Sequence, residues 1–358
     1  MGDMNHYKCP ACGAPLVFDG GTGKLQCEFC GSSYEPKAFE EERKAQASAS
    51  EEEAETSQWG VEEGMKAYSC PSCGAQVICD QTTAATSCPY CGNNAVIPRQ
   101  FEGAMKPQYI LPFKITKDQA IAALKEHYKG KILLPKAFKN QNQIKKIQGV
   151  YVPFWLFDRD TEGQASYEAT RSSSHRDGDY IVTETRHYRI SRAGGISFRK
   201  VPVDASSKMP DDYMDSIEPY NYGDLQEFSP VYMPGYLADQ YDVEQKDASG
   251  RADLRCENSL ESALRNTVTG YDTVITQGKN IQVTPKGASY AMLPVWLLST
   301  RWHKNSYLFA INGQTGKLVG NLPADKTRLH SIFWSTFLIT GLLLSLFFAD
   351  NIGAWFMD

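Results

Sequence analysis

The N-terminus of the chain lacks the features of an export signal. Its first ten residues, MGDMNHYKCP, contain no apolar run behind a positively charged region. His6 also stands where the myristoylation pattern that begins at Gly2 requires Ser or Thr. We therefore expect the N-terminal part of the protein to lie in the cytosol, where thiols stay reduced.

The chain also lacks recognisable catalytic and nucleotide-binding motifs. The segments that end at Lys24 and Lys317, GGTGK and GQTGK, do not complete the phosphate-loop pattern Gly-x4-Gly-Lys-Ser/Thr. The six histidines include no His-x3-His pair, and no Gly-x-Ser-x-Gly nucleophile motif occurs. We therefore predict that the protein is not an enzyme.

Basic residues are not in excess. The chain has 37 Lys and Arg against 42 Asp and Glu, and its sequence pI is about 5.8. A protein that mainly coats nucleic acid usually shows the opposite balance. Hydrophobic residues at 42% and charged residues at 22% are ordinary globular values, so most of the chain is expected to bury a core.

Cysteine, in contrast, is plentiful, and its spacing repeats. Eight of the ten cysteines form Cys-x2-Cys pairs, and fourteen residues separate the two pairs of each module. A shift of 61 residues places the second module on the first and also matches Pro10 with Pro71 and Gly31 with Gly92. The N-terminal region therefore contains an internal duplication. Its cysteines are Cys9, Cys12, Cys27 and Cys30 in the first copy and Cys70, Cys73, Cys88 and Cys91 in the second.

Each module has the ligand set of a closed metal site. Zn²⁺ prefers four tetrahedral ligands, and a Cys-x-x-Cys turn presents two thiolates. A glycine follows the second cysteine of every pair, where a residue without a β-carbon lets the turn continue. We predict two zinc ribbons with one structural Zn²⁺ each; thiol redox chemistry and an iron–sulfur cluster are the alternatives. Cys79 and Cys256 are predicted to be packed thiols and not ligands.

The two ribbons carry little positive charge. Residues 7–36 contain two lysines against three carboxylates, and the one charged residue of 68–97 is an aspartate. Without a cluster of Lys and Arg there is little to neutralise phosphates. We expect the ribbons to contact proteins, and nucleic-acid binding is the alternative.

Charge and hydrophobicity divide the chain into segments. Residues 36–63 hold nine glutamates and few apolar side chains, which is typical of a flexible spacer or a solvated helix. The related segments at 153–156 and 294–297, PFWL and PVWL, suggest two related halves of a larger body. The predicted order is zinc ribbon 1 (1–36), acidic flexible linker (37–66), zinc ribbon 2 (67–98), α+β cytoplasmic body (99–325), transmembrane helix (331–349) and short extracytoplasmic tail (350–358).

Hydrophobic periodicity predicts the elements of the body. Thr116 and Gln119 form a capping box before a helix expected at 117–129. A second helix is expected at 247–268, with Leu254, Leu260 and Leu264 on its buried stripe. Period-two runs predict strands at 164–171, 180–190, 196–203, 271–283, 292–301 and 307–311, with turns at 177–179 and 194–195.

A lysine-rich stretch lies at the start of the body. Residues 97–149 contain eleven Lys and Arg against three carboxylates. This face, at 99–146, is expected either to be solvated or to lie against anionic lipid, where each basic residue contributes about 1 kcal/mol.

A long apolar run lies near the C-terminus. Residues 331–349, SIFWSTFLITGLLLSLFFA, contain no charge and would span about 28 Å as a helix, close to the roughly 30 Å hydrocarbon core of a bilayer. Lys326 and Arg328 precede the run, which predicts that the bulk of the protein stays in the cytoplasm. We expect a single-pass tail anchor in the cell membrane.

Taken together with the cysteines, several further segments resemble a known family. The chain is similar to the bacterial TFIIB-type double zinc-ribbon membrane proteins, the YdjG-like family, which are sometimes labelled helicase- or replication-factor-like. The resemblance implies a cytoplasm-facing scaffold that works with SPFH-domain and phage-shock-protein-A-like partners in the envelope stress response. The missing nucleotide motif gives the helicase label no support. The matching segments are YILPF (109–113), GVYVPFW (149–155), VPVD (201–204) and YMDSIEP (213–219).

The leading hypothesis is therefore a membrane-anchored zinc-ribbon adaptor that recruits protein partners. Two other classes compete with it. A nucleic-acid-binding protein would hold DNA or RNA through its ribbons with steep salt dependence. An enzyme would need a pocket in the body with convergent polar groups.

Overall fold

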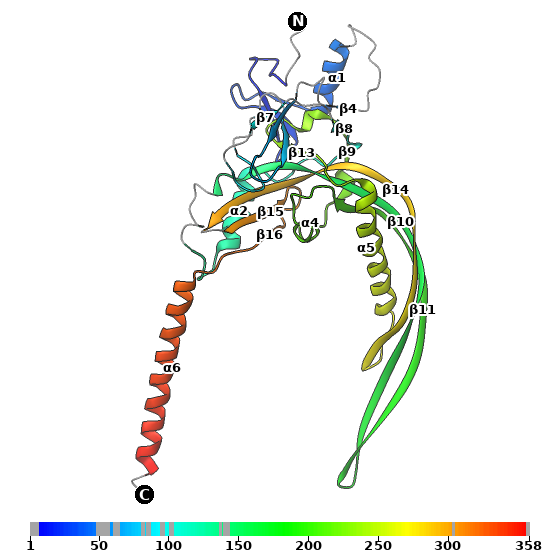
Figure 1. Ribbon diagram of the computed structural model, residues 1–358, viewed down its shortest axis with the longest axis vertical. Coiled ribbons are helices and arrows are strands. Elements are labelled where there is room, and N and C mark those ends of the chain that lie inside the picture. The colour runs from blue at the N-terminus through cyan, green and yellow to red at the C-terminus, as the bar shows by residue number, and fades with distance from the viewer. Residues whose placement is uncertain are drawn as a thin grey trace.

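The computed structural model describes residues 7–47, 58–59, 65–79, 83, 87–93, 97–99, 104–135, 138, 144–302 and 305–355. These residues form a head that contains both cysteine modules. A curved arm of strands and the C-terminal helix extend from the head on the side away from the N-terminus (Figure 1).

The first cysteine module forms a small sheet of its own. Strands β1, β2 and β3 are antiparallel, and the β1–β2 hairpin places Leu16 opposite Cys27 and Asp19 opposite Lys24. A helix, α1, follows the third strand, and its Phe39 lies against Tyr34 with ring centroids 5.8 Å apart. The bounds are β1 Leu16–Asp19, β2 Lys24–Cys27, β3 Ser33–Tyr34 and α1 Pro36–Ala47.

The second cysteine module belongs to the main sheet. In the described residues this sheet has eleven strands, with the order β12-β9-β14-β10-β13-β6-β5-β7, while β11 pairs with β10 and β15 joins β14 to β16. Strand β6 of the module pairs antiparallel with β13 of the body. The bounds are β5 Lys66–Ser69, β6 Gln76–Cys79, β7 Ile97–Arg99, β9 Tyr109–Ile110, β12 Gln226–Glu227, β13 Leu237–Asp239, β15 Asn305–Asn312 and β16 Leu318–Gly320; β4 (Gln58–Trp59) and β8 (Ala104–Met105) form a separate pair.

Three long strands, β10 (Gln148–Asp177), β11 (Tyr180–Asp204) and β14 (Thr273–Trp302), form the arm. They start in the head and run out of it together, with β10 between the other two (Figure 1). Strand β14 accompanies β10 only as far as Thr170, so the last part of the arm is a two-stranded ribbon. The predicted turn at 177–179 is confirmed, because Gly178 closes the ribbon with a φ of 59°.

Alternating side chains of β10 are buried on both faces of the sheet. Val150 and Phe154 belong to one apolar cluster, whereas Tyr151 and Trp155 belong to the other. A strand directs successive side chains to opposite faces, so a continuous apolar run suits a strand that is covered on both sides. The head is therefore built in layers around the start of β10.

The predicted helices of the body are confirmed as α2 (Lys117–Tyr128) and α5 (Gln245–Asn266). Thr116 and Gln119 make both hydrogen bonds of the capping box before α2. Helix α5 packs on one face of the arm, but Leu254 is 56% exposed and lies off its buried stripe. That stripe consists of Ala248, Ala252, Cys256, Leu260 and Leu264. The shorter helices are α4 (Asp211–Ser216), η2 (Tyr222–Asp224) and η3 (Pro230–Tyr232).

The predicted α+β body is wrong, because the described residues are mostly β-sheet. The expected turn at Gly194-Gly195 is in fact the interior of β11, where Gly195 faces Glu162 of β10. A β-carbon at Gly195 would lie 2.8 Å from the Thr161 carbonyl oxygen. Gly195 therefore permits close approach of the two strands, and Gly194-Gly195 does not mark a chain reversal.

The prediction of a single-pass membrane protein is also wrong. Helix α6 spans Lys326–Trp355, but no helix among the described residues is long and apolar enough to cross a membrane. Three serines and two threonines interrupt the apolar side chains of residues 331–345. The membrane helix at 331–349, its extracytoplasmic tail at 350–358 and the cell-membrane localisation that depended on them are not supported.

Two predicted segments are only partly covered. Most of the acidic linker lies outside the described residues, apart from α1, β4 and residues 65–66. The lysine-rich stretch is described in part, and there Lys114 pairs with Asp224 at 2.6 Å and Lys129 with Glu126 at 3.3 Å.

Candidate metal centres

The four Cys-x-x-Cys turns share one backbone design. In each turn the glycine that follows the second cysteine donates its N–H to the first cysteine's carbonyl, at 2.8 to 2.9 Å. The first cysteine in turn donates its N–H to a carbonyl five residues on. Because this geometry requires a left-handed residue, glycine is needed there. The four glycines are Gly13, Gly31, Gly74 and Gly92, with φ between 69° and 75°.

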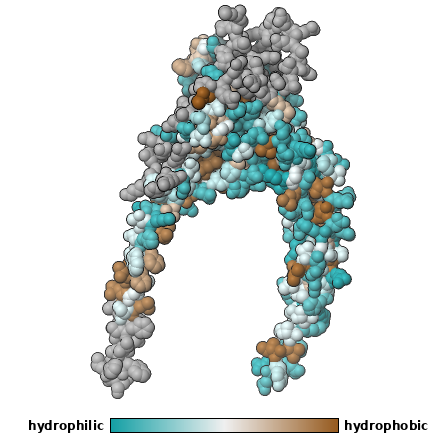
Figure 2. Space-filling view, viewed as in Figure 1, coloured by the Kyte–Doolittle hydropathy of each residue, from teal (hydrophilic) through white to brown (hydrophobic). Residues whose placement is uncertain are grey.

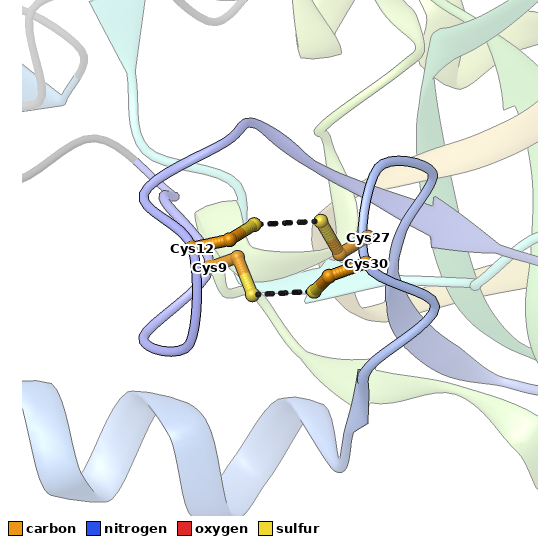
Figure 3. A group of neighbouring side chains, drawn as sticks. All are labelled: Cys9, Cys12, Cys27 and Cys30. Atoms are coloured by element: carbon orange, nitrogen blue, oxygen red, sulfur yellow. Dashed lines mark hydrogen bonds between the residues drawn. The ribbon is translucent and has the colours of Figure 1, made fainter.

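These turns bring the eight predicted cysteines into two groups of four. Within each group the sulfurs lie within 4.8 Å of one another. In the first group the Cys9 and Cys30 sulfurs are 3.5 Å apart, as are those of Cys12 and Cys27 (Figure 3). In the second group the Cys70–Cys91 and Cys73–Cys88 distances are 3.6 Å. Each group can hold one metal ion.

The spacing of the sulfurs fits a tetrahedral thiolate site. Zn–S bonds of about 2.3 Å place tetrahedral ligands about 3.8 Å apart. The observed pairs are slightly closer than that, and four thiols fill every tetrahedral position. A metal ion bound here would have no position left for water or substrate, so its role would be structural.

The first group contains one neighbour that the spacing of cysteines did not reveal. The hydroxyl of Tyr34 lies 3.5 Å from the Cys9 sulfur. This hydrogen bond, helped by backbone N–H groups of the same turn, lowers the pKa of Cys9 to about 6. A thiolate is the form that binds metal, so Tyr34 favours ligation at neutral pH.

Both modules are hydrogen-bonded to the same short segment of the body, residues 234–239. Phe18 of β1 donates its N–H to the Pro234 carbonyl at 3.0 Å, and its ring lies edge-on to Tyr232, with centroids 5.3 Å apart. Strand β6 pairs with the next residues, placing Cys79 opposite Leu237 and Val77 opposite Asp239. The metal sites are therefore attached to the body through strands and are not free appendages.

The second turn of each module differs in its surroundings, which sequence reasoning missed. The 61-residue shift makes Phe29 equivalent to Tyr90. Tyr90 is 7% exposed and belongs to the apolar cluster of the head, whereas Phe29 is 78% exposed. The sequence does show an aromatic residue at both positions, but their burial depends on tertiary contacts.

The two remaining cysteines lie outside both groups, as predicted. Cys79 is fully buried in β6, and its thiol donates to the Thr83 carbonyl at 3.2 Å. Cys256 is buried on the α5 stripe, and desolvation raises its pKa. Both are packed thiols.

The fold and the sites define a class of protein: a β-sheet body that carries a duplicated four-cysteine module. The chain is 36% identical over 340 residues to a Bacillus subtilis (strain 168) protein described as "Uncharacterized protein YdjG". The alignment covers 95% of this chain and 96% of that protein, so the chain belongs to the YdjG family. No protein-family model and no solved structure matches the chain, and the TFIIB-type assignment gains no support from these comparisons.

Proposed function

We propose that the protein is a zinc-ribbon adaptor that holds a protein partner through its first ribbon. The observation that carries this proposal is the exposure of Phe29 at the position where the second ribbon buries Tyr90. The duplication thus supplies its own example of how such a turn meets a protein surface. Ribbon 2 uses its aromatic residue inside the molecule, and ribbon 1 offers the equivalent residue to another molecule.

The physical argument concerns apolar surface. An exposed aromatic ring next to polar neighbours is typical of a binding hot spot, because its burial on association removes a large apolar area from water. Figure 2 shows that exposed apolar side chains also occur along α6 and at the tip of the arm. Phe29 differs from these because it lies between two candidate metal ligands, Cys27 and Cys30, and a bound metal ion would hold this turn rigid. A rigid anchor loses little entropy on binding.

Zinc is the metal that we propose for both groups. Four thiolates in a reducing compartment form the usual structural zinc site. Iron–sulfur clusters also use four cysteines, but they have to be assembled from iron and sulfide. A single zinc ion needs no such assembly and fits the tetrahedral spacing of the sulfurs. Zinc binding would supply on the order of 10 kcal/mol of folding free energy to each ribbon.

Charges on ribbon 1 favour a protein partner over nucleic acid. Lys24 is neutralised by Glu35 at 3.0 Å, and Glu28, beside Phe29, is exposed. A phosphate backbone needs several uncompensated cations, which this surface does not provide. The partner surface should therefore be an apolar pocket with a basic rim. SPFH-domain and phage-shock-protein-A-like proteins, which the family resemblance suggests, are the first candidates.

The test is capture of these candidates by the zinc-loaded full chain. Phe29→Ala should weaken capture at least about tenfold, because one central aromatic anchor contributes about 2 kcal/mol or more. The matched control is Ile132→Ala, which removes a side chain that is 69% exposed outside the ribbons. Zinc content and thermal stability should stay unchanged in both variants. Equal capture by Phe29→Ala and the parent protein would show that ribbon 1 does not dock through this turn.

A further inference from the structure

The outermost strand of the arm has an open edge. Strand β11 pairs with β10 along its length and with no other described strand. On the side away from β10, every second residue directs its N–H and C=O groups outward. Over residues 181–193, the Ser191 carbonyl is the one outward backbone group that is hydrogen-bonded to another described residue, and it accepts from Arg192 Nη1 at 3.0 Å. An edge of this kind can template the addition of another strand.

The opposite edge of the arm is protected. Strand β14 covers β10 up to Thr170, and immediately beyond that point the Asp272 carboxylate accepts the backbone N–H of Ser172 at 2.6 Å. A side chain thus occupies the position that a further strand would take. Within the described part of the chain, residues 181–193 of β11 have no carboxylate that closes their edge in this way. The edge is open on one side of the arm only.

The open edge is positively charged. Residues 181–193 contain three arginines and one carboxylate, Glu184. Arg186 is paired with Glu184 at 2.9 Å, but Arg192 bonds to the neutral hydroxyl of Thr267 at 3.0 Å. Arg189 forms no ion pair with any described residue. Neither Arg189 nor Arg192 therefore forms an ion pair with a described residue.

These two cations lie on opposite faces of the sheet. Arg192 is opposite Ala165, which is buried beneath α5, whereas Arg189 is opposite Glu168 on the other face. An extended peptide that pairs with the edge also alternates its side chains between the two faces, so it can reach both arginines. A phosphate backbone that lies on one face of the sheet cannot reach both arginines. A second copy of β11 would bring like charges together, which destabilises a strand pair.

We propose that residues 181–193, which we call the β11 edge, bind an acidic, extended segment of a partner protein by strand addition. Backbone hydrogen bonds would provide much of the affinity, and Arg189 and Arg192 would select acidic side chains. This surface is separate from ribbon 1 and lies on the arm. The inference does not depend on the proposed docking of Phe29.

The test uses a synthetic peptide of ten residues in which Glu-Glu and Val-Val pairs alternate, so that each face of the extended peptide carries Glu. Binding to the zinc-loaded full chain is followed by fluorescence anisotropy. The Arg189→Glu/Arg192→Glu variant should bind the peptide at least about tenfold more weakly than the parent protein does, because two favourable cross-strand charge pairs become repulsive. The control is Arg171→Glu, which makes one such charge reversal on β10, and it should bind within about twofold of the parent protein. Circular dichroism and zinc content confirm that both variants are folded.

Three further measurements separate the competing explanations. A peptide N-methylated at every second residue keeps its charge but loses backbone donors, and its binding should fall about tenfold or more. Equal binding of the methylated peptide, or of the double variant, would overturn strand addition. Tighter binding of oligothymidine than of the peptide, abolished by the double variant, would overturn the proposal in favour of nucleic acid. If the parent protein is a dimer and the double variant is a monomer, the edge would be assigned to a second copy.

Phe29→Ala should leave peptide binding unchanged, so failure of either proposal is distinguishable from failure of the other.

Discussion

Asp239 is a carboxyl group in unusual surroundings. It ends β13, it is 1% exposed, and it accepts a hydrogen bond from Ser206 Oγ at 2.6 Å. Desolvation by burial raises its pKa to about 7 from an ordinary value of 3.8. The folded protein therefore keeps a proton on Asp239 over a pH range in which the unfolded chain has released it.

This difference predicts how stability depends on pH. Between about pH 4 and 7 the unfolded state binds fewer protons at this residue than the folded state does, so the free energy of unfolding falls as pH rises. Asp239→Asn removes the ionisable group and keeps an acceptor for Ser206, but its NH2 replaces the oxygen that accepts the Gln240 N–H at 3.0 Å. We expect the stability of the variant relative to the parent protein to be higher at pH 8 than at pH 4. Chemical denaturation across this pH range measures the effect, and an unchanged pH slope in the variant would contradict it.

Residue identity also explains why the metal-binding groups could be predicted and their surroundings could not. Cysteine spacing and the following glycine are local requirements of one tight turn, and all four turns adopt the expected geometry. The burial of Tyr90 and the exposure of Phe29 depend on contacts with segments far along the chain. Tyr34 likewise comes close to Cys9 only after the ribbon has folded. Local rules therefore located the ligands but not the groups that tune or present them.

At the scale of elements, the sequence predicted features that short motifs encode, but it did not predict where a long strand continues. The capping box at Thr116 and the turn at Gly178 are encoded within four residues, and both are confirmed. The interior glycines of β11 have the same composition as a turn, yet both pair with β10 in an extended strand. The pairing of β6 with β13 joins positions roughly 160 residues apart and leaves no local trace in the sequence.

That pairing predicts unequal consequences of losing the two metal ions. The Cys70→Ser/Cys73→Ser variant should release one zinc ion, free β6 from β13 and expose the backbone of Leu237–Asp239. The Cys9→Ser/Cys12→Ser variant should also release one zinc ion but disturb mainly the small sheet of ribbon 1. Hydrogen exchange at residues 237–239 distinguishes the two, and the ribbon 2 variant should exchange markedly faster. Equal exchange would mean that β13 is held without help from the second metal site.

At the scale of the whole molecule, the arm and the head differ in what stabilises them. The head buries apolar clusters on both faces of its sheet, whereas residues 171–187 are exposed on a ribbon of two strands. An isolated pair of strands is marginally stable in water. The distal ribbon should therefore contribute little to the free energy of unfolding.

Shortening the arm tests this directly. Replacing residues 172–185 by Asn-Gly, which favours a tight hairpin turn, should change the melting temperature by no more than a few degrees. The matched control removes 164–170 and 187–193, which include the buried Ala165 and Tyr167 beneath α5, and it should lower the melting temperature strongly. A large loss of stability on removing the distal ribbon alone would show that it packs against something that holds it in place.

The length of β10 also sets how far the protein can reach. From Arg159 to Asp177 the strand covers nineteen residues, which corresponds to about 60 Å of extended chain. A compact globule of 358 residues would have a radius of gyration of only about 20 Å. If partners bind both ribbon 1 and the distal arm as proposed, the length of the arm would set how far apart they are held.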